Sequence, residues 1–205
     1  MKIVLGMPAF NEGEKIEGII NEIKNLVDDI IVCNDGSTDS TGIIAQKMGA
    51  IVINHKKNLG YGSAINSIFS KAREMEADIL ITFDADGQHR SKDIQSVIQP
   101  IANGEADIVI GSRFLENEIE MPRYRKFGIK TITSLANISS EIKLSDSQSG
   151  FRAYNHKSLS EIFLTEKGMG ISTEILIKAN RKKLRIKEVP IKILYQGKTS
   201  THNPI

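Results

Sequence analysis

The feature that most constrains this chain is an alternation, over its first 115 residues, of two kinds of apolar pattern. Short runs that are apolar throughout are separated by stretches such as 12–27, where apolar residues stand three or four positions apart, as in an amphipathic helix. Strands that are apolar throughout are typical of parallel sheets with helices on both faces. The runs predicted as strands occupy 2–10, 28–37, 50–55, 78–87 and 106–114. The sequence therefore predicts an α/β fold with a Rossmann-like, mostly parallel sheet flanked by helices.

The pattern changes after residue 114. The stretch 115–144 is basic and then amphipathic without a clear strand, and one more strand is expected at 186–196. Pro190 interrupts that run, which favours an edge position because proline cannot donate to a central ladder. No boundary between two domains is evident, and 205 residues suit a single domain with a substantial core.

Charge and cysteine content exclude some classes of protein. A net charge of +2 with 25% charged residues argues against a general nucleic-acid binder, and the one cysteine, Cys33, cannot form an internal disulfide. The apolar run at the N-terminus is too short for a signal peptide, and no run approaches the roughly 18 apolar residues of a membrane span. We therefore expect a soluble or peripheral protein, without a transmembrane segment in this chain, from a reducing compartment.

Polar clusters follow the predicted strands: "PAFNE", "NDGSTD", "NLGYG", "DADGQH" and "GSRF". Ligands of parallel α/β sheets bind beyond the carboxyl ends of the strands, where these clusters would meet. Asp84 and Asp86 are two residues apart, so they would share a face, and a divalent cation would relieve their repulsion. Mg²⁺ and Mn²⁺ prefer oxygen ligands, and Gln88 adds an amide oxygen. The alternative is a solvated turn in which aspartate caps a helix.

The cluster "NDGSTD" places Asp35 and Asp39 around a glycine. Both carboxylates have the chemistry to hydrogen-bond a base or a ribose. The alternative is a helix N-cap at Ser37 or Thr38, with Asp39 favouring the helix dipole, and the two interpretations are compatible.

Six motifs in order, the five clusters (the third extended to "NLGYGSA") and then "SGFR", resemble family-2 glycosyltransferases with the GT-A fold. The likeness covers nearly the whole chain. It is closest to the branch that transfers sugar from a nucleotide diphosphate to dolichyl or polyprenyl phosphate, and "SGFRAY", "GMGISTEI" and the C-terminal stretch resemble archaeal members that build protein-linked glycans. The resemblance implies one catalytic domain over 1–205, with 115–205 forming the acceptor side and the edge strand.

The resemblance also implies roles on the donor side. Residues bordering the nucleotide would be Pro8, Asn11 and Glu12, with Asp35 and Asp39 on the base and ribose. Residues holding Mg²⁺ or Mn²⁺ on the diphosphate would be Asp84, Asp86 and Gln88. The family usually has aspartate where this chain has Asn34, so a charged role at that position is in doubt.

On the acceptor side, the resemblance implies that Arg113 lies near the acceptor phosphate, with Arg125 and Arg152 as further phosphate ligands. Asp146 resembles the family's base position. A surface salt bridge is the commoner fate of an arginine. The histidines His89 and His202 are expected to lie behind the ligands or at the surface.

The implied reaction is attack by an acceptor oxygen on the anomeric carbon, with inversion and loss of a nucleoside diphosphate, and the metal offsets charge on the leaving group. The archaeal-like tail favours UDP-GlcNAc or UDP-glucose. The alternatives are a dolichyl-phosphate mannose synthase using GDP-mannose and a non-catalytic nucleotide-sugar binding module. A lipid acceptor implies peripheral association with the cytoplasmic face of a membrane, and 122–138 has the composition of an interfacial segment or of a helix packed on the domain.

Overall fold

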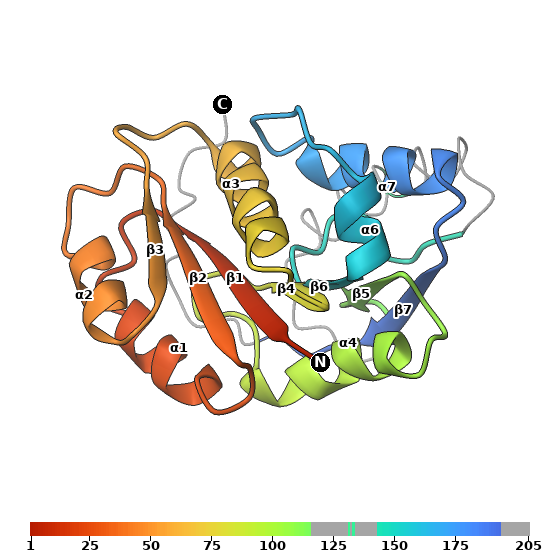
Figure 1. Cartoon of the computed structure of the whole chain (residues 1–205), viewed down its shortest axis with the longest axis horizontal. Helices are drawn as coiled ribbons and strands as arrows, with labels where there is room; N and C mark the ends of the chain where they lie inside the picture. Colours follow the sequence, from red (N-terminus) through yellow and green to blue (C-terminus); the bar gives the residue numbers. More distant parts are fainter. Residues whose placement is uncertain (116–130, 132, 134–142, 194–205) are drawn as a thin grey trace.

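The computed structural model describes residues 1–115, 131, 133 and 143–193, and within these ranges it forms one sheet with helices on both faces (Figure 1). The strand order is β3-β2-β1-β4-β6-β5-β7. The strands are β1 (Ile3–Ala9), β2 (Asp29–Asn34), β3 (Ile51–Asn54), β4 (Ile79–Thr82), β5 (Ile108–Ser112), β6 (Arg152–Asn155) and β7 (Ile186–Pro190). The helices are α1 (Ile16–Ile23), α2 (Thr41–Lys47), α3 (Tyr61–Glu74), η1 (Ser91–Asp93), α4 (Ile94–Ala102), α6 (His156–Glu161) and α7 (Ile171–Arg181). The predicted α/β fold with a single, mostly parallel sheet is confirmed.

Three described elements were not predicted from the sequence, namely strand β6 and helices α6 and α7. Strand β6 changes the topology of the sheet. It lies between β4 and β5 and pairs antiparallel with both, while the other pairs in the described sheet are parallel. Strands β3 and β4 are equally short but apolar over at least three residues, whereas β6 has the sequence RAYN and lacks such an apolar run. The edge position predicted for β7 is confirmed, since β7 pairs only with β5 in the described sheet and ends at Pro190.

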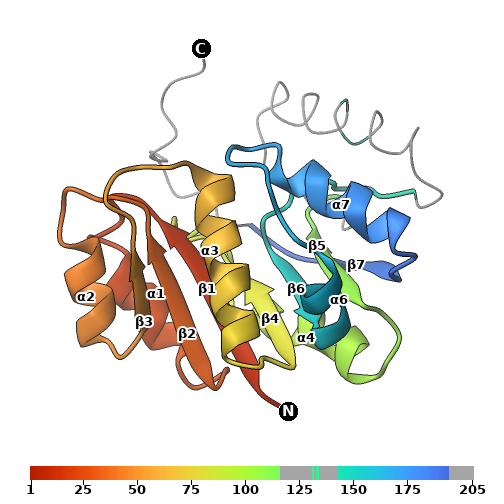
Figure 2. The ribbon, with the colours of Figure 1, turned by 45° about the horizontal axis from the view of Figure 1, so that its top comes forward.

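The apolar side chains form two layers, one on each face of the sheet. Helices α1, α2 and α4 cover one face, and α3, α6 and α7 cover the other (Figure 2). Gly6 in β1 permits the approach of α3, because a Cβ at this position would lie 2.2 Å from Cγ2 of Ile68. Among the described residues, no helix has the length and apolar character needed to cross a membrane.

An ion pair between buried Asp107 and exposed Arg185 joins the start of β5 to the start of β7. The Asp107 carboxylate accepts hydrogen bonds from the Arg185 backbone N–H at 2.8 Å, from the Arg185 guanidinium and from the Asn155 amide. Burial alone would raise the pKa of Asp107, but these hydrogen bonds lower it to about 2. A carboxyl group whose folded pKa is depressed stabilises the fold above its unfolded pKa, and that stabilisation is lost as the pH falls toward 2.

We expect Asp107→Asn to lower the free energy of unfolding at pH 7 by about 2 kcal/mol. The difference from wild type should shrink by about half at pH 3. At that pH the wild-type carboxyl is mostly protonated in the unfolded state but still mostly ionised in the folded state. Urea unfolding at both pH values measures this, with the exposed Glu22→Gln as a matched control. An equal difference at pH 7 and pH 3 would contradict the electrostatic origin of the effect.

Candidate active site

The carboxyl ends of the parallel strands bring the predicted clusters to one edge of the sheet. Register places Ala9 beside Asn34 and Asn34 beside Asn54, so the segments that follow β1, β2 and β3 start side by side. The segment after β4 joins them, because Gly6 of β1 pairs with Thr82. The predicted meeting of these clusters is therefore present in the fold.

The segments after β1 and β2 are tied together by side chains of the predicted nucleotide site. Asn11 has a left-handed backbone (φ 56°), and its Oδ1 accepts the Thr38 N–H at 2.9 Å. Asp39 accepts the N–H groups of Gly13 at 3.0 Å and of Thr41, the first residue of α2, at 2.9 Å. Burial alone would raise the pKa of Asp39, but the bonds from Thr41 and Gly13 lower it. Asp39, rather than Ser37 or Thr38, thus supports the start of α2.

Asp35 is buried at the end of β2, and its carboxylate is engaged by the chain itself. It lies 2.6 Å from Nδ1 of His55 and accepts the N–H groups of Leu59 and Gly60, each at 2.9 Å. His55 Nε2 lies 2.8 Å from the Ser67 hydroxyl. His55 was not predicted as a site residue, although it directly follows β3, whose end lies beside the end of β2, and that position is the signal in the sequence.

Asp84 and Asp86 lie on the segment after β4 in unequal surroundings. Asp84 is contacted by the Tyr61 hydroxyl at 3.2 Å and by His89 Nε2 at 3.0 Å, whereas Asp86 accepts the backbone N–H of Gln88 at 3.0 Å. Burial and the charge of Asp84 raise the pKa of Asp86. For Asp84, burial alone would raise the pKa, but His89 and then Tyr61 lower it.

This arrangement fits a divalent cation whose coordination is completed by a ligand. Burial, and after it the negative charge of Asp84, raise the pKa of Asp86, and a cation would relieve the repulsion between the two carboxylates. Gln88 is buried on the same segment. Within the described residues, no group of three His, Cys, Asp or Glu side chains forms a complete metal site. Mg²⁺ commonly binds through one or two carboxylates plus phosphate oxygens and water, so an incomplete protein site is what such an ion uses.

Arg113 and Asp146, predicted separately, form one ion pair. Nε and Nη2 of Arg113 donate to the two Asp146 oxygens at 2.6 and 2.7 Å, and the Arg113 backbone N–H donates at 3.1 Å. The Asp146 side chain is 0% exposed and that of Arg113 is 12% exposed. Glu188 of β7 in turn accepts the Asp146 N–H at 2.9 Å. These contacts favour a positioning role for Asp146, through Arg113, over the predicted role as a base.

Arg152 lies below the site instead of lining it. Its residue is 2% exposed, and its guanidinium donates to the carbonyl oxygens of Ser149, Ser172 and Ser147 at 2.8, 3.2 and 2.7 Å. Because Arg152 is almost fully buried and donates to three carbonyl oxygens, these contacts favour a structural role over the predicted one as a phosphate ligand. Arg125, His202 and nearly all of 122–138 lie outside the described residues.

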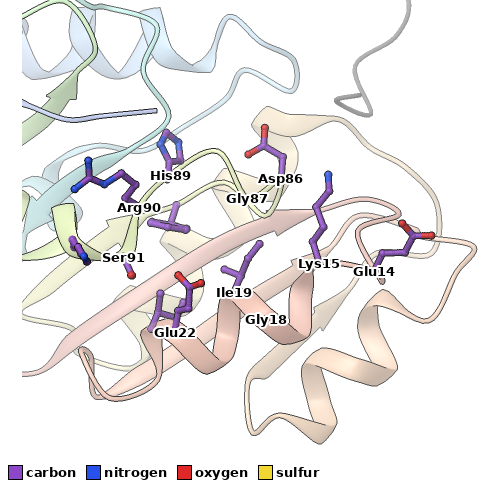
Figure 3. A pocket seen from close by; sticks show the side chains of 13 residues that line it. Glu14, Lys15, Gly18, Ile19, Glu22, Asp86, Gly87, His89, Arg90 and Ser91 are labelled. Atoms are coloured by element: carbon purple, nitrogen blue, oxygen red, sulfur yellow. The ribbon is translucent and has the colours of Figure 1, made fainter. Parts of the chain in front are cut away.

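A cleft of about 630 Å³ adjoins the carboxylate pair on the α1 side (Figure 3). Its walls include Asp86, Gly87 and His89 from the segment after β4, and Lys15, Ile19 and Glu22 from the start and body of α1. Figure 3 shows the Lys15 side chain rising from α1 toward the segment that carries Asp86. Lys15 Nζ lies 3.2 Å from the Glu12 carboxylate, and Lys15 and Asp86 line the same cleft.

Comparison with known proteins gives three consistent results. The profile of "Glycosyl transferase family 2" matches residues 5–163. A UDP-N-acetylglucosamine–dolichyl-phosphate N-acetylglucosaminyltransferase of Methanococcus voltae is 37% identical over 216 residues, covering 94% of this chain and 86% of that protein. A dolichol-phosphate mannosyltransferase of Pyrococcus furiosus is 33% identical over 202 residues, covering 93% of this chain and 56% of that protein.

A solved structure supports the fold independently. Glucosyl-3-phosphoglycerate synthase from Mycobacterium tuberculosis, in complex with Mn²⁺, UDP and glucosyl-3-phosphoglycerate, superposes with a TM-score of 0.77 at 22% identity. The match covers 97% of this chain and 73% of that one. The GT-A fold that the motifs predict is thereby confirmed.

Proposed function

Since the chain belongs to glycosyl transferase family 2 and is a glycosyltransferase, we propose that it transfers a sugar from a nucleotide diphosphate to dolichyl or polyprenyl phosphate. UDP-GlcNAc or UDP-glucose is the favoured donor, in keeping with the Methanococcus voltae relative. GDP-mannose is the alternative donor, since the Pyrococcus furiosus relative is a mannosyltransferase. The product would feed protein or cell-surface glycosylation.

One observation carries the proposal: a carboxylate pair and a fixed guanidinium meet at one edge of the sheet. The Arg113 charge lowers the pKa of Asp84, after the larger effects of burial, which raises it, and of His89 and Tyr61, which lower it. Asp84 and Asp86 suit a cation on a leaving diphosphate, and Arg113 suits an anionic acceptor. A donor diphosphate and an acceptor phosphate are both anions, and this edge offers each a different partner.

On the donor side, we assign Mg²⁺ or Mn²⁺ to Asp84, Asp86 and Gln88. When bound, the ion would offset negative charge on the leaving diphosphate as a Lewis acid. Pro8, Asn11 and Glu12 would border the nucleotide. Asp35 and Asp39 would shape the nucleotide pocket chiefly by holding its loops through backbone hydrogen bonds. Their carboxylate oxygens would also accept hydrogen bonds from the base and the ribose.

On the acceptor side, Arg113 would orient the phosphate of the lipid. A phosphate monoester is already largely anionic near neutral pH, so no strong base is needed to generate the attacking oxygen. That oxygen forms a bond to the anomeric carbon while the carbon–oxygen bond to the diphosphate breaks and its electron pair leaves with the nucleoside diphosphate. A single displacement of this kind inverts the anomeric centre. Asp146 would contribute by holding the Arg113 guanidinium in its orientation.

The lipid acceptor places the proposed reaction at a membrane surface. Peripheral association with the cytoplasmic face is part of the proposal. Its support is the lipid named for the relatives, since dolichyl phosphate resides in a membrane.

We expect label to enter the organic phase when the protein is incubated with Mn²⁺, dolichyl phosphate and one labelled nucleotide sugar. Parallel reactions would contain UDP-GlcNAc, UDP-glucose or GDP-mannose, with EDTA and lipid-free reactions as controls. Metal-dependent label from a UDP-sugar supports the proposal, and label from GDP-mannose alone selects the mannosyl alternative. Donor binding without lipid label from any sugar, in a folded preparation supplied with membranes, would point to a different acceptor or to the binding-module alternative.

A further inference from the structure

The Asp84 carboxylate is held by two side chains from different parts of the chain. The hydroxyl of Tyr61, the first residue of α3, donates to Oδ1 at 3.2 Å, and Nε2 of His89 lies 3.0 Å from Oδ2. The Asp84 side chain remains 30% exposed, so it still faces the site while each oxygen is anchored from behind. Asp86, by contrast, has a backbone N–H on one oxygen.

The His89 ring is buried between two aromatic side chains. The ring contacts Phe83 and Phe151 with centroid distances of 5.4 and 5.1 Å, and the side chain is 5% exposed. Because Asp84 accepts the hydrogen bond, Nε2 carries the proton. Nδ1 is buried and has no hydrogen-bond partner among the described residues, so Nε2 makes the ring's one hydrogen bond within them.

Tyr61 connects this anchor to the nucleotide side of the site. The turn that begins α3 donates two backbone N–H groups, from Leu59 and Gly60, to Asp35, and the next residue is Tyr61. One turn of three residues therefore holds Asp35 by its backbone and Asp84 by a side chain. Gly150 leaves room for this contact, since a Cβ there would lie 2.7 Å from the Tyr61 hydroxyl and 2.8 Å from Asp84 Oδ2.

We propose that Tyr61 and His89 are positioning residues that orient the Asp84 carboxylate toward the donor's diphosphate and its cation, and so set the affinity of the site for that cation. The proposal rests on the proposed function, which makes Asp84 a ligand. Groups that hydrogen-bond a ligand from behind fix its direction, and their loss commonly costs 10–100-fold in metal affinity or activity. The turn 59–61 would also fix the spacing between Asp35 and Asp84.

The test uses variants that separate the hydrogen bond from packing. Tyr61→Phe removes one hydroxyl, and His89→Phe keeps an aromatic ring between Phe83 and Phe151 but removes the donor. His89→Gln keeps an N–H donor near the position of Nε2. Tyr154→Phe is the matched control, because its buried hydroxyl bonds Arg152 and Thr82 instead of Asp84.

The readout is Mn²⁺ affinity, measured by electron paramagnetic resonance titration with UDP present, beside thermal unfolding. We expect Tyr61→Phe and His89→Phe to weaken Mn²⁺ binding by about 10–100-fold, with His89→Gln and Tyr154→Phe within about threefold of wild type. Wild-type affinity in both phenylalanine variants would overturn the positioning role while leaving the proposed function intact. If wild type itself binds no Mn²⁺ with UDP, the metal-dependent function fails and the positioning role fails with it.

A second measurement does not depend on the His89→Phe variant folding. Nitrogen-15 NMR of the wild-type ring should show the proton on Nε2, and Asp84→Asn should shift that resonance. A proton on Nδ1 instead would overturn the contact from which the proposal starts.

Discussion

Replacing Asp86 with asparagine is expected to lower kcat for sugar transfer by about 10³-fold, which corresponds to the several kcal/mol that a metal ion supplies to charge stabilisation. The substitution removes the charge proposed to hold the cation but keeps an oxygen that can accept the Gln88 N–H. Assay of label transfer at saturating donor and Mn²⁺ measures it.

The same substitution should make the free protein more stable. Burial and the charge of Asp84 raise the pKa of Asp86, so its ionised form opposes folding at neutral pH, and a neutral amide removes that penalty. We therefore expect the substitution to raise the melting temperature of the protein while it nearly abolishes sugar transfer. Glu14→Gln, on the α1 wall of the same cleft, should change neither property appreciably. Transfer within tenfold of wild type would rule out Asp86 as the charge that holds the cation.

Replacing Arg113 with methionine is expected to damage both stability and acceptor use. Asp146 is 0% exposed, and without the guanidinium its charge loses its ionic partner, which typically costs about 3–5 kcal/mol. If Arg113 also orients the acceptor phosphate, kcat/KM for the lipid should fall by about 10²–10³-fold while KM for the donor changes little. Urea unfolding and steady-state kinetics measure the two effects separately.

A double substitution separates the two roles of this pair. Arg113→Met with Asp146→Asn removes the unpaired charge, so most of the lost stability should return while transfer stays impaired. Arg113→Lys keeps a positive charge but not the two-pronged geometry, and it should give an intermediate loss. Recovery of transfer in the double variant would show that Arg113 serves the fold alone.

The local sequence was enough to predict the parallel strands and the polar clusters that follow them. The first five strands and the clusters after them could be placed at one edge because parallel strands share a direction, and Pro190 correctly indicated an edge strand. Strand β6 was not predicted because its sequence, RAYN, lacks the continuous apolar run that identifies the equally short β3 and β4. Its insertion depends on its long-range pairing with β4 and β5.

The side-chain partnerships were less predictable than the clusters. Arg113 and Asp146 are 33 residues apart, and Tyr61 and Asp84 are 23 apart, so no local pattern relates them. Arg152 shows that similar local motifs can also have different surroundings in the fold. "GSRF" and "SGFR" look alike as motifs, yet Arg113 is partly exposed in its ion pair with Asp146, whereas Arg152, which begins the antiparallel strand β6 opposite Thr82, is buried.

The position of β6 in the sheet also affects the order in which the strands can pair during synthesis. Both sheet neighbours of β5, β6 and β7, are synthesised after it, and one edge of β4 stays open until residue 155 has been added. Strands β1 to β4 can pair as they leave the ribosome, since β1 joins β2 to β4 and β2 joins β3. The half that carries Asp35 and Asp84 can therefore assemble first, while β5, which leads to Arg113, waits for the second half of the chain. A nascent chain would acquire the proposed donor side before the proposed acceptor side, and until then it would expose strand edges that favour association with other chains.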